Sequence, residues 1–492
     1  MTRRNRLGVA ALGAASLVAA GLAAPLSSTA DPGHSAGPVT VRGVLALVAP
    51  DVVRAEVYEG EEGVWFEPGV QLVAGADPLE FISRRPSYTQ PITTTWRAGS
   101  RTGTVPAGTQ KDFSGLTDFA VLKVTTKGGK VLRKRKVSAC INGWETQRIR
   151  PDAPAMSPYP RNGCPMNPFT IASVQGIQGG WSTPFTTNME KPFTLKPGRY
   201  KLVTQIRAPW STSLGLSAAE RRVTSRLVVR KGQAEERRDA GRTSTSPDLV
   251  PNATEPTRRQ AGSDGPRPDL RSLPAFQISL NRKKTHLRFA ATVWNAGDSP
   301  LVVDGYRGRG EDHMDAYQYF FDTDGEQVGY QQVGQLHFHG KNHQHWHFED
   351  FARYRLLKAD KSQAAKSGKV SFCLANTDAV DYTVPGADWN PDGTDLATAC
   401  GSPGSLAIRE VLSSGSGDTY AQFRAGQAFN LKGLKKGWYW IAVEANPMGN
   451  LVEQDKTNNV SLRKVWIGGK QGKRKIKVPP IGQIDESMTG NW

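Results

Sequence analysis

The chain has 492 residues, with 63 Lys and Arg against 45 Asp and Glu, and a formal net charge of +18. This length allows two or more domains, each with its own core, and the 51 glycines and 32 prolines argue against helical bundles and favour β-rich domains joined by turns. After the N-terminal segment, no stretch approaches the roughly 20 apolar residues of a membrane-spanning helix, so we expect no transmembrane segment.

The first 30 residues have the order typical of a secretory signal peptide. Three arginines, Arg3, Arg4 and Arg6, precede an apolar run of small residues. We therefore predict a signal peptide over residues 1–30 and a secreted, extracellular protein, and we favour a bacterial source.

Residues 38–230 alternate short apolar runs with turn-forming residues, as in VTVRGVLALV and RVTSRLVVR. This spacing predicts an N-terminal β-sandwich. There is no histidine between His34 and His286 and no catalytic constellation, so we expect an accessory domain.

Positive charge is concentrated in this part of the chain. Of the +18, three charges come from the signal peptide and three from residues 269–492, which leaves +12 for residues 31–268. A secreted basic domain suits an anionic polymer of the cell wall or matrix, although a solvated surface without a partner is an equal alternative. Nucleic acid is disfavoured as a partner for an exported protein.

Residues 231–267 are charged, rich in Ser, Thr, Pro and Gly, and almost free of large apolar residues, which predicts a flexible linker. Strand-like runs return over residues 268–470, where every catalytic candidate lies, and residues 471–492 form a C-terminal tail. The fold class predicted for the chain is therefore all-β, with a second, sandwich-like domain after the linker.

The chain has four cysteines, which allow three pairings. Outside the cell, disulfides are favoured over free buried thiols. Proximity along the chain predicts one disulfide in each domain, Cys140–Cys164 and Cys373–Cys400.

Five of the eight histidines lie within eleven positions: His337, His339, His343, His345 and His347. In NHQHWHF the last three alternate, so they share one face of a strand, whereas on a helix the middle one would point away. Three neutral imidazoles suit zinc, copper, iron or nickel with a position left open for chemistry, and we prefer this to unconnected surface histidines. The strand must bend to bring them to one ion, and Trp346 should then face the core. We favour supporting roles for the two earlier histidines over roles as ligands.

Four stretches, in this order, resemble the catalytic domain of the lysyl oxidases, copper-dependent amine oxidases that act on peptidyl lysine. HQHWHFEDFARYRLL resembles the copper-binding stretch, and GKVSFCL the segment with the cofactor lysine. GDTY resembles the segment with the cofactor tyrosine, and NPMGNLVEQDKTNNV the C-terminal strand pair. The resemblance covers roughly residues 268–467.

The resemblance implies roles for named residues. Copper would be bound by His343, His345 and His347, and Lys369 and Tyr420 would form the lysine tyrosylquinone cofactor. A structural calcium site, with oxygen ligands of the kind calcium prefers, would comprise Asp269, Leu270, Glu453, Asp455, Asn458 and Asn459.

The residues themselves agree with this chemistry. A lysine amine adds to an oxidised phenol ring only when it is unprotonated, and burial of Lys369 in KVSFCL would lower its pKa. A general base must take a proton from the substrate. We select Asp350, with Glu349 and Asp418 as alternatives by proximity in sequence.

We therefore expect a secreted copper amine oxidase that converts primary amines, protein lysine among them, to aldehydes, with dioxygen as acceptor and with release of hydrogen peroxide and ammonia. Two alternatives remain open at this point. One is a copper-binding wall or matrix protein without quinone chemistry, and the other is a zinc or iron enzyme that uses the same three histidines.

Overall fold

The computed structural model of the protein describes residues 41–57, 63–143, 145–161, 163–187, 192–231, 265–308, 311–339, 345–390 and 396–486. From Val41 onward these residues belong to one compact unit. The predicted signal peptide, most of the predicted linker and His343 lie outside the described residues.

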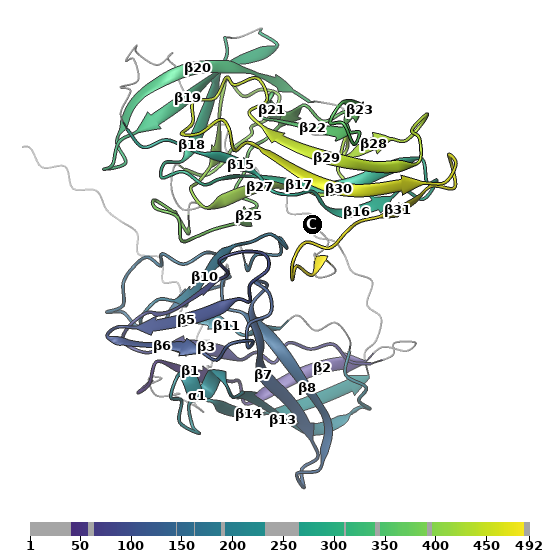
Figure 1. Cartoon of the computed structure of the whole chain (residues 1–492). Helices are drawn as coiled ribbons and strands as arrows, with labels where there is room; N and C mark the ends of the chain where they lie inside the picture. The colour runs from purple at the N-terminus through teal and green to yellow at the C-terminus, as the bar shows by residue number, and fades with distance from the viewer. Residues whose placement is uncertain are drawn as a thin grey trace, which may run out of the picture. The chain divides into compact units, whose positions relative to one another are not determined.

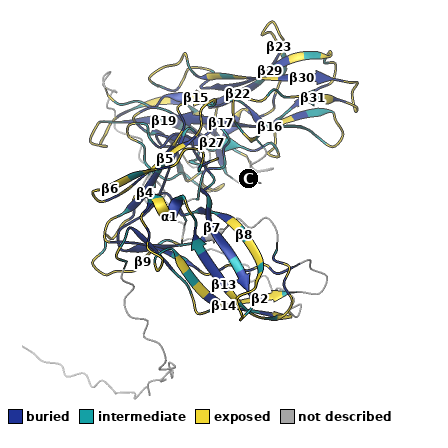
Figure 2. Cartoon of the chain, turned by 60° about the horizontal axis from the view of Figure 1, so that its bottom comes forward, coloured by how far each residue is buried: buried dark blue, intermediate teal, exposed yellow. Residues whose placement is uncertain are grey.

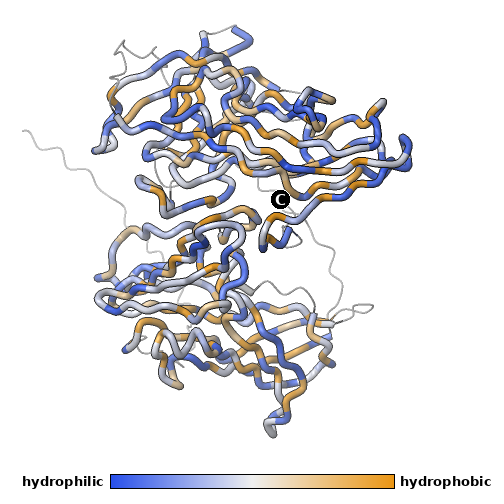
Figure 3. Tube along the Cα trace, viewed as in Figure 1, coloured by the Kyte–Doolittle hydropathy of each residue, from blue (hydrophilic) through white to orange (hydrophobic). Residues whose placement is uncertain are grey.

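Nearly all of the regular structure is β-strand (Figure 1), which confirms the predicted all-β class. Strand β5 (Thr93–Ala98) shows the cause, because TTTWRA buries every second residue, namely Thr94, Trp96 and Ala98. This is the two-residue period of a strand with one face in a core. Figure 3 shows the same mixing of apolar and polar residues along the strands. The one helix among the described residues is α1 (Trp210–Ser213).

The first part of the chain, residues 41–231, forms three sheets. Two have four strands, in the orders β1-β3-β11-β9 and β10-β4-β5-β6, and the third has six, in the order β12-β8-β7-β13-β14-β2. The remaining strands of this part are β1 (Leu45–Val48), β2 (Val52–Val57), β3 (Gln71–Ala74), β4 (Leu79–Arg84), β6 (Arg101–Val105), β7 (Leu116–Thr125), β8 (Val131–Cys140), β9 (Gln147–Arg148), β10 (Ala172–Ile177), β11 (Trp181–Pro184), β12 (Thr186–Thr187), β13 (Gly198–Ile206) and β14 (Arg222–Lys231).

The second part, residues 265–486, forms three more sheets. Their orders are β15-β17-β27-β25, with β16 and β28 also paired to β17; β24-β21-β20-β19-β18-β26; and β23-β22-β29-β30-β31. The strands are β15 (Leu270–Ser272), β16 (Phe276–Leu280), β17 (His286–Asn295), β18 (Leu301–Tyr306), β19 (His313–Phe321), β20 (Gln327–Phe338), β21 (Trp346–Glu349), β22 (Ala352–Leu357), β23 (Gln363–Lys366), β24 (Ser371–Phe372), β25 (Asp378–Ala379), β26 (Ala407–Leu412), β27 (Ser416–Tyr420), β28 (Ala428–Asn430), β29 (Gly437–Ala445), β30 (Val460–Gly468) and β31 (Lys475–Lys477).

Each part has its own apolar core. The first core extends from Val44 to Val229 and the second from Leu270 to Ile467. A smaller cluster joins them, because Phe169 of the first part packs with Phe276 and with other buried residues of the second. The division into sandwich, linker and catalytic domain stays a prediction.

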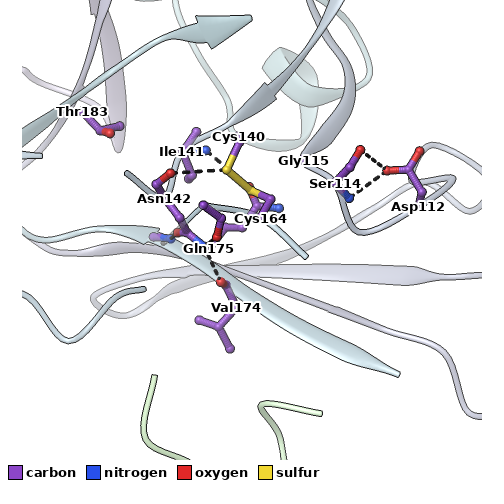
Figure 4. Close-up of a disulfide and its surroundings, with 12 residues drawn as sticks. Asp112, Ser114, Gly115, Cys140, Ile141, Asn142, Cys164, Val174, Gln175 and Thr183 are labelled. Atoms are coloured by element: carbon purple, nitrogen blue, oxygen red, sulfur yellow. Dashed lines mark hydrogen bonds between the residues drawn. A yellow bond between two sulfur atoms is a disulfide. The ribbon is translucent and has the colours of Figure 1, made fainter. Parts of the chain in front are cut away.

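Both predicted disulfides are present, and no cysteine is free. Cys140, the last residue of β8, is bonded to Cys164 with their Cα atoms 5.7 Å apart. Figure 4 shows the neighbouring Asn142, whose side-chain amide donates a hydrogen bond to the Val174 carbonyl over 3.0 Å. The pairing by proximity along the chain is therefore confirmed. The second disulfide, Cys373–Cys400, lies beside the site described below.

The described residues contain no helix of the length and apolarity that a bilayer crossing requires.

Candidate functional site

The end of the histidine-rich stretch forms strand β21. This strand pairs antiparallel with β20 and places His347 opposite His337. Side chains alternate along a strand, so Trp346 and Phe348 share one side, where both are buried in the second core. The prediction that Trp346 packs in the core is confirmed. His345 lies just before β21.

Two of the predicted metal ligands converge. The Nε2 atoms of His345 and His347 are 2.9 Å apart, and their ring centroids are 4.7 Å apart. Two nitrogens that each bind one ion at about 2 Å, at right angles, lie about 2.8 Å from each other. The spacing therefore suits a shared metal ion. His343, the third predicted ligand, lies outside the described residues.

A serine that sequence reasoning missed connects the histidines. Ser371 Oγ lies 3.3 Å from His347 Nδ1 and 3.0 Å from His339 Nε2, and the rings of His339 and His347 stack with centroids 4.5 Å apart. A partner on Nδ1 orients an imidazole so that Nε2 can face a metal. His337 is further out, with its Nε2 3.8 Å from Glu349 Oε2.

Lys369 and Tyr420 are 51 positions apart in sequence but adjacent in space. Lys369 Nζ lies 4.4 Å from the centre of the Tyr420 ring and 4.9 Å from that of Phe372. Lys369 lies shortly before β24, whereas Tyr420 ends β27, which lies between β17 and β25 in its sheet (Figure 1). The fold therefore places the Lys369 amine over the face of the Tyr420 ring.

Burial sets the charge of the amine. The Lys369 side chain is buried, and this lowers its pKa from 10.5 to about 8 even though Asp418 acts in the opposite direction. Near pH 8 about half of the molecules therefore carry a neutral, nucleophilic amine at this position.

The phenol is held by the backbone of one residue, Cys373. The Tyr420 hydroxyl donates to the Cys373 carbonyl over 3.0 Å and accepts from the Cys373 N–H over 3.1 Å. Burial, together with Asp418 and Glu410, raises the pKa of Tyr420 well above its usual value, so the phenol is protonated. Because Cys373 is bonded to Cys400, the disulfide restrains the backbone that holds the phenol.

These groups line one cavity of about 170 Å³. The imidazoles, the amine and the phenol come from three different strands or strand ends and face the same small space. Its lining comprises His345, His347, Lys369, Cys373, Ala375, Thr377, Asp418, Thr419, Tyr420 and Arg424.

The carboxylate in this cavity is Asp418 and not the predicted Asp350. Asp350 is exposed, has a positive φ of 58° and is not part of the lining. Asp418 is buried, its Oδ2 has no hydrogen-bond partner among the described residues, and burial raises its pKa well above the usual value. Of the acidic candidates, the structure therefore brings Asp418 to the site.

The part of the chain that contains the cavity residues matches a known protein family. The family model described as lysyl oxidase matches residues 328–473. Over this segment the chain is similar to the lysyl oxidase family.

Individual proteins that align with part of this chain support the match to the family model. The chain is 34% identical to human protein-lysine 6-oxidase over 120 residues, which is 24% of this chain and 25% of the human protein. It is 33% identical to the pig protein of the same name over 120 residues, 42% of that protein, and 29% identical to mouse lysyl oxidase homolog 4 over 119 residues, 14% of that protein. The chain therefore spans less than half the length of these relatives.

Glu410 is a second residue that sequence reasoning missed. It is fully buried on β26, where its Oε2 accepts the Leu374 N–H over 3.0 Å, and its Oε1 has no partner among the described residues. Burial raises its pKa well above the usual value. No sequence motif identifies Glu410, because its hydrogen-bond partner, Leu374, lies in a segment that is distant in sequence.

The predicted calcium ligands also gather in one place, near the start of β15 and the end of the lysyl oxidase segment. Asn458 Nδ2 donates to Asp269 Oδ1 over 3.0 Å and to Asp455 Oδ2 over 3.2 Å. Glu453 Oε2 accepts the Leu270 N–H over 2.9 Å.

Two oxygens in this cluster are left without partners. Asn458 Oδ1 and Asn459 Oδ1 are buried and have no hydrogen-bond partner among the described residues. Buried polar atoms are rarely left unsatisfied, and carboxylate and amide oxygens are what calcium prefers. The donor set therefore fits a calcium ion, although Asp269 already pairs with Arg271 over 2.8 Å.

Proposed function

We propose that the protein is a secreted copper amine oxidase of the lysyl oxidase type. It would convert primary amines to aldehydes, with dioxygen as acceptor and with release of hydrogen peroxide and ammonia. The observation that carries the proposal is the single cavity shared by His345, His347, Lys369 and Tyr420. Metal-binding imidazoles, a phenol and a neutral amine are the three components that such an enzyme requires.

The imidazoles of His345 and His347, together with His343, would hold copper. The facing Nε2 atoms and the contact of His347 Nδ1 with Ser371 support this assignment. Bound copper would supply the redox chemistry with dioxygen that oxidises a neighbouring phenol. The protein's own contribution is to aim the imidazoles at one point, and burial lowers the pKa of the adjacent His339, which favours its neutral form.

Lys369 and Tyr420 would together form lysine tyrosylquinone, which would supply a carbonyl that reacts with primary amines. The chain prepares both precursors. Burial keeps a fraction of Lys369 neutral, with its Nζ 4.4 Å from the centre of the Tyr420 ring, and the Cys373 backbone fixes the phenol oxygen. Lys369 is buried, which limits the contact of its amine with bulk water.

Asp418 is the residue that we propose as general base, in place of Asp350. It lines the cavity that a substrate amine would enter, whereas the side chain of Asp350 is exposed. Burial raises the pKa of Asp418, which makes its carboxylate a stronger base than an exposed one.

A cavity of about 170 Å³ fits a slender aliphatic amine better than a bulky one. The matched relatives are named for action on protein lysine. We therefore propose primary amines that include the lysine side chain as substrates. We propose that calcium binds at Asp269, Leu270, Glu453, Asp455, Asn458 and Asn459, where it would join the two ends of the second part of the chain.

The test is amine-dependent peroxide release by the copper-loaded protein, combined with redox staining for a protein-bound quinone. Tyr420→Phe and His345→Ala should abolish both signals. Tyr439→Phe is a control, because Tyr439 is buried, its hydroxyl donates to the Lys435 carbonyl and it does not line the cavity.

The two alternatives give different results in the same test. Bound copper without staining would indicate a copper-binding wall or matrix protein. Bound zinc or iron without staining would indicate a three-histidine enzyme of another class. Either result would overturn the proposed amine oxidation.

A further inference from the structure

The outward face of the six-stranded sheet β12-β8-β7-β13-β14-β2 is covered by basic side chains. On β14, Arg222, Arg226 and Arg230 are exposed, whereas Leu227 and Val229 between them belong to the first core. Figure 2 shows exposed residues along β8 of the same sheet. Cross-strand partners share a face, so the register assigns nine cations to what we call the basic sheet face: Arg54, Lys123, Lys134, Lys136, Arg199, Lys201, Arg222, Arg226 and Arg230. Glu56, the partner of Arg230, lies on the same face.

Like charges stand directly opposite each other on this face. Lys201 of β13 is the cross-strand partner of Arg226 of β14, and Lys123 of β7 is the partner of Lys134 of β8. Directly opposed like charges destabilise a sheet. Within the described ranges none of these four residues forms an ion pair with a carboxylate, whereas Lys136 pairs with Asp118 over 3.3 Å. The sheet therefore retains repulsion that an anionic ligand would relieve.

The spacing of the cations on the sheet indicates the shape of the ligand. Neighbouring strands are about 4.8 Å apart, and residues two apart on a strand are about 6.8 Å apart. The cations consequently form a repeating array along and across an open sheet, which matches an extended polymer with charges at short, regular intervals. Five of the nine are arginines, whose planar guanidinium groups bind phosphate with two parallel hydrogen bonds.

The other residues of the face argue against nucleic acid and membrane. Among the described cross-strand partners on this face there is no aromatic side chain on which a base could stack; Tyr200 is paired with Leu227 on the core side. The central apolar residues, Val121 and Val203, are buried, so they are not available for insertion into a lipid surface.

We propose that the basic sheet face binds a linear phosphate polymer, of the kind built from phosphates joined by small polar units. The cations contact the backbone phosphates, and recognition does not depend on the sequence of the intervening units. The interaction is electrostatic, so its affinity falls as salt rises. This site is separate from the cavity of the proposed amine oxidation and does not depend on it.

The test exploits the opposed like charges. Lys134→Glu together with Lys201→Glu places a carboxylate opposite Lys123 and another opposite Arg226, so two repulsive cross-strand pairs become attractive. Binding of long-chain inorganic polyphosphate to the full chain is measured by titration calorimetry at several salt concentrations. We expect affinity to fall roughly tenfold or more, as for the loss of several phosphate contacts, while the melting temperature stays the same or rises. Loss of affinity without loss of stability separates binding from misfolding.

The matched control is Lys283→Glu together with Lys432→Glu, which makes the same change in net charge at exposed positions of the second part of the chain. This variant should retain polyphosphate affinity within about twofold of the parent. An equal loss in the control, or unchanged affinity in the sheet-face variant, would overturn the proposal. Equal or tighter binding of duplex DNA or of anionic phospholipid vesicles, at the same phosphate concentration, would overturn the choice of ligand.

Discussion

At the scale of single residues, the protonation of Lys369 determines when cofactor formation can occur. An ordinary lysine is almost fully protonated at pH 8, whereas burial gives Lys369 a pKa of about 8. Protonation removes the lone pair that must attack the oxidised ring, so the reactive fraction increases as pH rises through 8 and is lost as pH falls below it.

We therefore predict that the yield of quinone after copper loading rises between about pH 6.5 and pH 9, with its midpoint near the pKa of about 8. Lys369→Arg, which stays protonated at every accessible pH, should give no quinone. Lys366→Arg, at an exposed position on β23, should behave like the parent. The measurement is quinone redox staining per mole of bound copper, and a flat pH profile would contradict the assignment of Lys369.

A second residue-scale prediction concerns Ser371. Its hydroxyl lies between His347 Nδ1 and His339 Nε2, and partners of this kind tune metal affinity by about 10–100-fold. We expect Ser371→Ala to lower copper affinity by about tenfold, with little change in melting temperature. Competition with a copper chelator measures this, and Ser362→Ala, in an exposed turn, provides the comparison. Unchanged affinity would show that Ser371 is only a packing residue.

At the scale of elements, strand β27 receives support from the first part of the chain. Asn167 Nδ2 donates to Thr292 Oγ1 over 2.8 Å, and the Thr419 hydroxyl donates to Asp378 Oδ2 over 2.6 Å. Thr419 is the neighbour of Tyr420 and also lines the cavity. A buried network therefore connects a loop of the first part to the strand that carries the proposed cofactor tyrosine.

This network predicts an effect of Asn167→Ala on the cavity, whose lining residue Thr419 has its Oγ1 3.5 Å from Asn167 Nδ2. Removal of one partner from a buried hydrogen-bond network costs about 1–3 kcal/mol, and the unsupported end of β27 should exchange its amide hydrogens faster. Hydrogen exchange of the peptide that contains residues 416–420 is the measurement, and quinone yield should fall in parallel. Asn390→Ala removes another amide that joins the two parts, through the Ser157 carbonyl, and should leave that peptide unchanged. Equal effects of the two variants would contradict a specific role.

The sequence allowed some of these elements to be predicted and not others. Local patterns were sufficient for the all-β class, for the burial of Trp346 and for both disulfides, because alternation and short chain separation are properties of neighbouring residues. Ser371 and Glu410 were missed, because their partners come from other strands. Asp350 was preferred to Asp418 on sequence distance from the histidines, whereas strand pairing decides which carboxylate enters the cavity.

At the scale of the whole molecule, the proposed calcium site connects residues almost 190 positions apart. Asp269 and Leu270 lie where the second part of the chain begins, and Asn458 and Glu453 meet them from near its end. A ligand that binds only the folded state stabilises it by mass action, by about 2.7 kcal/mol at a concentration one hundred times its dissociation constant.

We expect calcium to raise the melting temperature of the parent, and a calcium chelator to lower it, in buffer with copper held constant. Asp455→Ala should remove most of this response. Asp360→Ala is a matched control, because both carboxylates accept hydrogen bonds from the backbone N–H and hydroxyl of the residue two positions later, yet Asp360 lies away from the unpartnered amide oxygens. A calcium response that is equal in the two variants would place the ion elsewhere. No response in the parent would mean that the cluster is held by its own hydrogen bonds and by the Arg271–Asp269 ion pair alone.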